Sequence, residues 1–582
     1  MLKQLLFYII SFTLLSACSN NNNSSHTSTK ANGNVYYGGV FKINEVEDFK
    51  SLYPLNTTEE IALHLTYQIY EGLVKFKQAD LSIMPSLAEK WTISPDGKTY
   101  TFNIRKGVKY HNDPCFKSGE GRALTANDFK YCFDVLCTPS AINQGYQLFK
   151  NRVVGANEYY DDINKGITNK NGVSGVKVID DYTLQIELVN SYSGFLNLLA
   201  QTYCAVYPKE ALDKYGIEMR IKCVGTGPFF LKEAKEGNYA ILSRNDHYWD
   251  KDEFGNNLPY LDAIKVSFIK EKKTELLEFK KGNLDMIFRL PLEMISDVVG
   301  ELEEAQAGGN PEFKMQVMAA AQSNYYAFLH QSNLFKNKKV RQAFNYAIDR
   351  EGLVNHTMQG EGQIAQYGMV PPCFANYDAK KIKGYNFDVD KARKLMAEAG
   401  YPNGKGFPEV TLELNSGGSR NTQIAEVVQK MLQENIGVNV KMSVIPFAQY
   451  MDNYENGKSP FFRSSWVADY PDAENFLNNL YSANLPANAN DRAYINPMRY
   501  KSLAFDSLFY LASKEKNETK REQLLLQADQ IQTDDAAVLM LFYSENTRLV
   551  QLGVQNMDQN AMEYRDFSRV YIDPSLHKSV AK

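Results

Sequence analysis

Residue types that often carry catalysis occur in this sequence, but their spacing matches no catalytic or metal-binding pattern. The seven histidines are scattered, and none lies in the His-Glu-x-x-His spacing that places two zinc ligands on one face of a helix. No Gly-x-Ser-x-Gly motif is present to form the sharp turn that exposes a serine nucleophile. No Cys-x-x-Cys pair offers metal ligands. We therefore expect no catalytic residue, no metal site and no cofactor.

Two glycine motifs match parts of a phosphate-binding loop without completing one. Gly97-Lys98-Thr99 has the end of such a loop, but Thr92 occupies the position of its first glycine. A hairpin turn at Pro95-Asp96-Gly97 explains this triplet. Gly360 and Gly362 form a Gly-x-Gly pair outside any clear strand-turn-helix unit. Neither motif indicates a phosphate site.

The N-terminus has the features of a signal peptide. Lys3 precedes the apolar run Leu5–Leu15, which is shorter than the ~20 residues of a membrane-spanning helix. The run leads into Ser16-Ala17-Cys18, and Leu-Ser-Ala-Cys resembles the bacterial lipobox, in which the cysteine becomes the lipidated first residue of the mature protein. The alternative is an ordinary secretory signal with a chance cysteine at its end.

The chain after Cys18 divides into a tether and a folded body. Ser19–Asn34 contains almost no apolar residue, so we expect a signal peptide at 1–17 and a lipidated cysteine with a flexible tether at 18–34. A composition of 44% hydrophobic and 23% charged residues is typical of a globular protein. The length of 582 residues favours two or three structural units. A formal net charge of −4 does not indicate a nucleic-acid partner.

The cysteines permit disulfides in a secreted chain. Cys204 and Cys223 flank a predicted helix, and we expect them to pair. Cys132 and Cys137 lie five residues apart on one predicted helix, which is an awkward geometry for a bridge. The remaining pairings stay open for Cys115 and Cys373.

Turn and cap residues predict the main elements. Trp91–Val108 and Val176–Leu188 alternate as hairpins, and Thr125 is expected to N-cap a helix. Gly400 is expected to end the helix Val389–Ala399. Helices alternate with strands in the second half: we expect helices at 340–348 and 423–434, a strand at 437–445, a helix opened by Pro446, and a solvated helix start at 517–522.

The order and spacing of several segments resemble the oligopeptide- and dipeptide-binding proteins of ABC importers, from about Tyr36 to Asp573. Each segment alone is a weak match, and their combination is specific. The segments are 68–74 (QIYEGLV), 85–91 (PSLAEKW), 225–229 (GTGPF), 248–249 (YW) with 258–262 (LPYLD), 340–350 (VRQAFNYAIDR), 397–402 (AEAGYP) and 466–477 (WVADYPDAENFL).

The resemblance implies an α/β, bilobal, periplasmic-binding-protein-like fold with mixed sheets, a hinge and an extra domain inserted in the first lobe. Domain I would comprise 35–60, 189–324 and 541–582. Domain II, the insertion, would span 61–188, and domain III, the second lobe, 325–540. A peptide would be enclosed where the lobes meet, and hinge bending would close them.

The resemblance also implies ligand-contacting residues. Asp469 matches an aspartate that pairs with the peptide α-ammonium, and Arg463 an arginine that can meet the C-terminal carboxylate. Trp466 and Phe447 match aromatic pocket walls. The further expected contacts are Val467 in the second lobe and Thr58 and Glu60 in domain I.

Simpler roles stay open for three of these residues. Asp469 could satisfy a nearby backbone N–H, Arg463 could pair with a surface acid, and Trp466 could belong to the core.

The implied role is that of a monomeric, extracytoplasmic binding protein, lipid-anchored in the periplasm or at the cell surface, which delivers short peptides to permease and ATPase subunits. Proteins of this fold also carry nickel complexes, haem or sugars, so fold alone does not fix the ligand. A secreted peptidase or glycosidase is the alternative from another class, and the missing catalytic motifs disfavour it.

Substitution of Cys18 by Ala should release the protein from membranes or block its processing, because the lipid would have no attachment site. Membrane fractionation with and without detergent measures this. Normal maturation together with unchanged, detergent-dependent retention of the variant would contradict the lipidation of Cys18.

Overall fold

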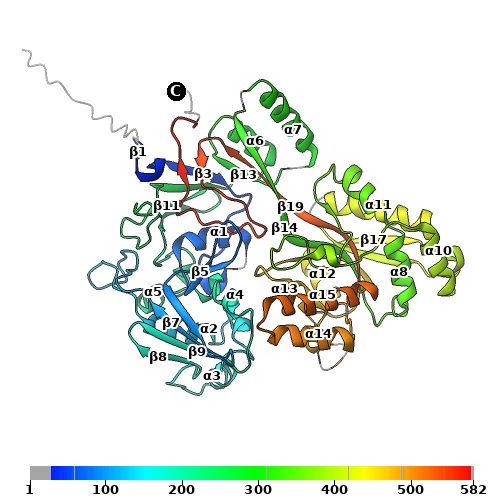
Figure 1. The fold of residues 1–582 in the computed structure, drawn as a ribbon, viewed down its shortest axis with the longest axis horizontal. Helices are drawn as coiled ribbons and strands as arrows, with labels where there is room; N and C mark the ends of the chain where they lie inside the picture. The colour runs from blue at the N-terminus through cyan, green and yellow to red at the C-terminus, as the bar shows by residue number, and fades with distance from the viewer. Residues whose placement is uncertain are drawn as a thin grey trace, which may run out of the picture.

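The structure is a computed structural model that describes residues 28–577, except 58, 291, 310, 417, 418, 487, 489, 490 and 494. The predicted signal peptide, Cys18 and most of the tether therefore lie outside the described residues. Figure 1 shows a mixed α/β protein in two bodies, joined by the strands β14 and β19. Among the described residues, no helix has both the length and the apolar character needed to cross a membrane.

An 11-stranded mixed sheet runs through both bodies. Its central strands are unusually long, and its outer strands belong to one body or the other. In spatial order the strands are β10 (Phe229–Lys235), β11 (Tyr239–Arg244), β12 (Ala263–Ser267), β3 (Val40–Asn44), β13 (Met286–Phe288), β19 (Val538–Gln551), β14 (Phe313–Phe328), β18 (Phe461–Val467), β16 (Val410–Asn415) and β17 (Val440–Ile445), with β15 (Gln363–Ile364) paired to β19.

The antiparallel pair β14–β19 is the connection between the bodies. Its register runs from Phe313 opposite Gln551 to Ala327 opposite Val538, with shifts between Ala319 and Ser323 and between Asn324 and Tyr325. The predicted boundaries of domain III at 325 and 540 fall on one facing pair of this ladder, Tyr325 and Met540. The division of the chain into three domains at these points remains a prediction.

The first body contains a separate four-stranded antiparallel sheet, β6 (Ala88–Ile93), β7 (Thr99–Ile104), β9 (Thr183–Glu187) and β8 (Val176–Asp180), in the order β6-β7-β9-β8. Both expected hairpins are confirmed, and Gly97 in the first turn has φ +74°, a conformation that favours glycine. Helix α2 (Ala126–Leu136) begins with a capping box between Thr125 and Asp128.

The second body packs helices on both sides of its strands. The expected elements are confirmed within a few residues at their ends, and Gly400 follows α10 with φ +96°. One buried apolar cluster fills the space between the sheet and α8, α10 and α11. The helices are α8 (Lys338–Tyr346), α10 (Val389–Glu398), α11 (Ser419–Ile436), α12 (Phe447–Glu455), α13 (Ala473–Leu477), α14 (Leu503–Lys514) and α15 (Glu518–Asp534).

The expected disulfide between Cys204 and Cys223 is wrong, since all six described cysteines are free. The two thiols lie in different surroundings: Cys223 lies beside the phenol of Tyr70, and Cys204 is buried near Cys137. Burial raises the pKa of the Cys223 thiol to about 12. These thiols are therefore protonated parts of the interior rather than cross-links.

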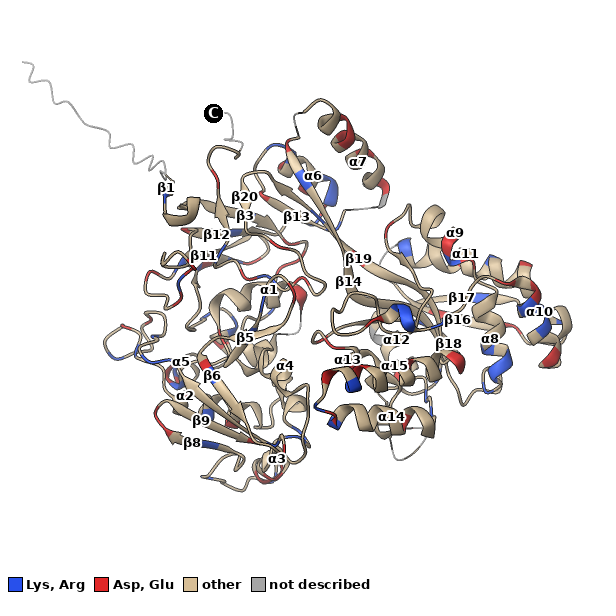
Figure 2. Cartoon of the chain, in the orientation of Figure 1, with Lys and Arg blue, Asp and Glu red and all other residues tan. Residues whose placement is uncertain are grey.

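Charged side chains are distributed over both bodies. Figure 2 shows Lys and Arg interspersed with Asp and Glu on helices and loops rather than gathered on one side in this view. This distribution agrees with the small net charge of −4.

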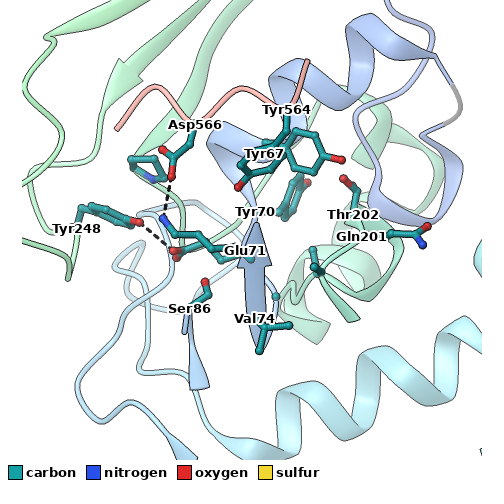
Figure 3. A pocket seen from close by; sticks show the side chains of 15 residues that line it. Tyr67, Tyr70, Glu71, Val74, Ser86, Gln201, Thr202, Tyr248, Tyr564 and Asp566 are labelled. Atoms are coloured by element: carbon teal, nitrogen blue, oxygen red, sulfur yellow. Dashed lines mark hydrogen bonds and ion pairs between the residues drawn. The ribbon is translucent and has the colours of Figure 1, made fainter. Parts of the chain in front are cut away.

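One buried carboxylate, Glu71, organises the junction after helix α1 (Glu60–Ile69). It accepts hydrogen bonds from Tyr248 Oη at 2.9 Å and Thr226 Oγ1 at 2.8 Å, and from Trp249 Nε1. Figure 3 shows it pointing toward Tyr248. The cavity beside it has a volume of about 30 Å³. That volume suits one or two water molecules and is far too small for a peptide.

Substitution of Glu71 by Gln should remove a fall in the free energy of unfolding between pH 4.5 and pH 7. Burial raises the pKa of Glu71 from 4.5 to about 7, so between these values the folded protein holds a proton that the unfolded chain has released. The contribution of Glu71 to the free energy of unfolding is therefore complete below pH 4.5. It falls by about 3 kcal/mol as the pH rises from 4.5 to 7. Denaturant titrations of both proteins across this range measure the difference.

Comparison of the Glu71→Gln variant with the wild type separates the pH dependence due to Glu71 from that of other buried groups. His111, whose pKa burial lowers to about 4, gives a slope of opposite sign that both proteins share. Glu89 is exposed, and Glu89→Gln is the matched control. A variant with the same pH slope as the wild type would contradict the assignment.

Candidate functional site

Three strands of the second body end at one edge of its sheet. Strand β16 pairs in parallel with both β17 and β18, so their carboxyl ends lie together. In open α/β sheets, ligand sites form outside the carboxyl ends of the strands. Asn415, Ile445 and Val467 are the last residues of these strands, and α12 follows β17 directly. This edge is the candidate site of the second body.

The segment after β18 is held by a buried ion pair. Asp472 caps α13 by accepting a hydrogen bond from the Glu474 N–H at 2.8 Å. Its carboxylate also accepts two hydrogen bonds from the guanidinium of Arg521, at 2.8 and 2.9 Å. Arg521 is only 9% exposed, so the expectation of a solvated helix start at 517–522 is wrong at this residue. Such a paired fork fixes both direction and distance.

Asp469 lies at the start of this segment and shares one partner with Trp466. Asn475 Oδ1 accepts from Trp466 Nε1 at 2.8 Å and from the Asp469 backbone N–H at 3.1 Å. Asn475 Nδ2 donates to Asp469 Oδ2 at 3.2 Å. The Asp469 side chain is exposed to solvent, yet protein atoms surround it closely enough that desolvation raises its pKa, and the Asn475 hydrogen bond opposes this effect.

Arg463 is a half-buried cation on β18. Its Nη1 donates to Asn415 Oδ1 at 3.1 Å. Among the described residues, neither Arg463 nor Asp469 takes part in an ion pair, while the neighbouring Arg420 is neutralised by Glu361 at 2.9 Å. Desolvation lowers the pKa of Arg463, because no carboxylate compensates its charge. The surface-acid alternative for Arg463 therefore finds no support in the described residues.

Apolar side chains are exposed beside these charges. Phe447 and Val467 each expose 58% of their surface, and Val444 exposes 50%. Trp466 is half-buried, with one part packed on the main apolar cluster, so it is only partly a core residue. Large exposed apolar groups at a strand edge are typical of a surface that a ligand or a partner covers.

The residues expected in the first body are placed differently. Thr58 lies outside the described residues. Glu60 is exposed at the start of α1 and forms an ion pair with Arg289 at 3.1 Å, so its charge already has a partner in its own body. Thr57, next to the undescribed position, is buried and donates to the Tyr53 carbonyl.

The two bodies contact each other near α13. Tyr192, in the loop before α4 (Phe195–Leu199), donates its phenol hydrogen to Glu474 Oε2 at 2.9 Å. Tyr470 donates to the same carboxylate oxygen, and Lys516 Nζ donates to the Pro95 carbonyl. Sequence reasoning missed these partners, because nothing in a single sequence connects Tyr192 with a carboxylate 282 residues away.

A cavity of about 830 Å³ lies between the bodies, next to these contacts. Its volume falls in the range of ligand sites. Asp469 does not line this cavity. The first lining residue after Asp469 in the chain is Pro471. The lining comes from 80–100 and 191–197 of the first body and from 373–376, 471–473 and 515–525 of the second.

The sequence and structure are similar to those of known binding proteins. Residues 82–487 match the model of the bacterial extracellular solute-binding proteins, family 5. The oligopeptide-binding protein OppA of Bacillus subtilis is 29% identical over 511 residues, covering 85% of this chain and 86% of OppA. The dipeptide-binding protein of Escherichia coli is 26% identical over 511 residues, covering 87% and 89%.

A solved structure of DppA from Helicobacter pylori, in complex with the peptide STSA, is 26% identical and superposes with a TM-score of 0.73, covering 92% of this chain and 98% of DppA. The heme-binding protein A of Haemophilus influenzae is 28% identical over 514 residues, covering 87% of each chain. The solved structure of DppA shares the fold of this chain, and the names of the curated relatives differ in ligand.

Substitution of Tyr192 by Phe should favour a more open arrangement of the two bodies. The change removes the phenol hydrogen bond to Glu474, worth about 1–3 kcal/mol, and leaves the aromatic ring. Small-angle scattering should show a larger radius of gyration for the variant. Tyr215→Phe is the control, because Tyr215 donates to Asp113 at 2.7 Å within the first body. Equal radii for both variants and the wild type would contradict this role of Tyr192.

Proposed function

Because the chain belongs to family 5 of the bacterial extracellular solute-binding proteins, we propose that it captures short peptides between its two lobes and delivers them to the permease of an ABC importer. The first and second bodies are the two lobes. Relatives named for oligopeptide and dipeptide binding, and a solved neighbour in complex with a peptide, support a peptide as the ligand.

The observation that carries the proposal is a pair of opposite charges at the edge of the second-lobe sheet, Asp469 and Arg463, neither of which has an ion-pair partner among the described residues. A free peptide has an ammonium at one end and a carboxylate at the other. Asp469 offers a carboxylate to the ammonium, and Arg463 offers a guanidinium fork to the carboxylate. Phe447, Trp466 and Val467 supply apolar surface for side chains of varied shape. A binder of mixed peptides requires this division of roles.

Closure of the lobes around the ligand is the proposed motion. The strands β14 and β19 are the main connection, and the contacts of Tyr192 and Lys516 link the facing surfaces. A peptide that contacts both lobes binds the closed arrangement in preference to the open one and shifts the population toward it. The cavity of about 830 Å³ provides space for side chains beyond those near Asp469.

Attachment to the membrane surface completes the proposal. The family acts outside the cytoplasm, and we place a lipid on Cys18, with the following residues as a tether. The protein would act as a monomer that docks on permease and ATPase subunits. We keep Thr58 and Glu60 of domain I as proposed ligand contacts on the family resemblance alone. Glu60 pairs with Arg289 in its own lobe.

We further propose that the chain has no enzymatic activity, in keeping with a family of solute-binding proteins. Incubation of the pure protein with a peptide mixture, followed by mass spectrometry, would reveal any cleavage. The same method applied to ligand that copurifies with the native protein distinguishes a peptide from haem, a nickel complex or a sugar.

Substitution of Asp469 by Asn should lower the affinity for a free-amine peptide by on the order of a hundredfold to a few thousandfold. When the lobes close, the ammonium is desolvated, and loss of its partner leaves a buried charge at a cost of ~3–5 kcal/mol. Acetylation of the peptide N-terminus deletes the same contact from the ligand side. The two changes should therefore be strongly non-additive in calorimetry of the four combinations.

The control is Asp390→Asn, which removes an exposed carboxylate from α10 of the same lobe. Additive effects of the variant and the acetyl group, or an Asp469→Asn protein that binds free-amine peptide like the wild type, would show that Asp469 is only structural.

A further inference from the structure

We propose that Asn475 is a positioning residue for ligand recognition, which orients the Asp469 carboxylate and the Trp466 indole toward the ligand and so sets the selectivity for a free N-terminal amine. This inference rests on the proposed function, because it assigns a second residue to the same ammonium site. Asn475 itself is 4% exposed and makes its contacts from within the protein.

The contacts of Asn475 define one orientation of its amide. Its Oδ1 faces two N–H donors, Trp466 Nε1 at 2.8 Å and Asp469 N at 3.1 Å. The reverse orientation would place an NH₂ group against both donors, so hydrogen bonding selects the observed one. The Nδ2 group then points to Asp469 Oδ2 at 3.2 Å. One amide thus holds both the backbone and the side chain of Asp469.

The element that carries Asn475 is itself fixed. Asn475 lies in α13, which Asp472 caps, and Asp472 is clamped by the two hydrogen bonds from Arg521. The Asn475 backbone N–H donates to the Asp472 carbonyl at 3.1 Å. A supporting group on such a braced element holds its partner more tightly than a loop residue would.

A neutral donor at this position suits recognition of a cation. The Asn475 N–H favours the ionised form of Asp469 and opposes the effect of burial on its pKa. An arginine or lysine would do the same but would also neutralise the charge that the ligand ammonium needs. Asp469 Oδ1 accepts no hydrogen bond from the described residues, so it is available to the ligand.

The same amide links the charge site to the aromatic wall. Trp466 Nε1 donates only to Asn475 among the described residues, so this bond sets the direction of the indole ring. Ring and carboxylate therefore move together if Asn475 moves. The first residue of a bound peptide would meet both groups at a fixed separation.

The test uses the full protein and one probe, the tightest-binding member of a defined library of short peptides, made with a free and with an acetylated N-terminus. Asn475→Ala should lower the affinity for the free-amine form by roughly ten- to a hundredfold, the size of a lost hydrogen bond to a charged group. Affinity for the acetylated form should fall by a smaller factor, because that ligand has no ammonium and loses only the fixed position of the Trp466 indole. The ratio of the two affinities should therefore fall at least severalfold.

Asn479→Ala is the matched control. Asn479 is a buried asparagine in the following turn, and its Nδ2 donates to the carbonyls of Asn475 and Phe476, at 3.3 and 3.2 Å. This variant should lose stability in a thermal melt and keep the wild-type affinity ratio. Asn475→Ser is the milder second variant if Asn475→Ala does not fold, and the same fall in the ratio is expected.

The outcomes separate this inference from the proposed function. A wild type that binds no peptide would overturn the proposed function. A wild type that binds both forms equally would overturn the ammonium site at Asp469 and with it the role of Asn475. A wild type that prefers the free amine, with folded Asn475 variants that keep the full preference, would overturn the role of Asn475 alone. Loss of affinity for both forms in equal measure would make Asn475 merely structural and would also overturn the inference.

Discussion

The backbone ladder between β14 and β19 is the constraint on which the other features depend. Both strands pass from one lobe to the other, so the twist of this pair affects how the lobes face each other. The ladder is interrupted between Ala319 and Ser323 and again before Tyr325, and such irregularities bend a strand and increase its twist. The Ala321 carbonyl, within the first interruption, accepts from the Ala468 N–H at 2.9 Å. The segment that bears Asp469 therefore starts beside an interruption of this ladder.

That segment combines three functions within ten residues. Trp466 and Asp469 face Asn475, Tyr470 and Glu474 face Tyr192 of the other lobe, and Asp472 is clamped by Arg521. A change in the position of α13 would therefore act on the ligand charge site and on the lobe contact at the same time. Burial of the ion pair between Asp472 and Arg521 requires both charges to be desolvated. The pair therefore fixes the geometry of the segment more than it adds to the net stability.

Local signals in the sequence were sufficient for many of the elements. Thr125, Pro95-Asp96-Gly97 and Gly400 each act through backbone chemistry within a few residues, and the structure has them where they were expected. The ligand contacts of Asp469 and Arg463, which the family resemblance implies, remain predictions. Long-range partners could not be predicted in this way.

The failures share one physical cause. Flanking a helix says nothing about the distance between two cysteines, so the pairing of Cys204 with Cys223 was wrong. Arg521 was expected on a solvated helix start because the sequence does not show that Asp472, 49 residues earlier, pairs with it. Each of these contacts is decided by the tertiary fold, which a single sequence does not record.

The way in which the first lobe is assembled has a kinetic consequence. Strand β3, near the N-terminus, lies between β12 and β13, and β13 pairs with β19 near the C-terminus. Gln68 donates to the Arg565 carbonyl across 497 residues, and Asn560 to the Gln78 carbonyl across 482. Closing such loops is entropically costly and slow, whereas the four-stranded sheet and the helices of the second lobe are formed by nearer neighbours. Strand β3 must therefore wait for β12 and β13, and the free edge of β13 is open to association with other chains until β19 has been made.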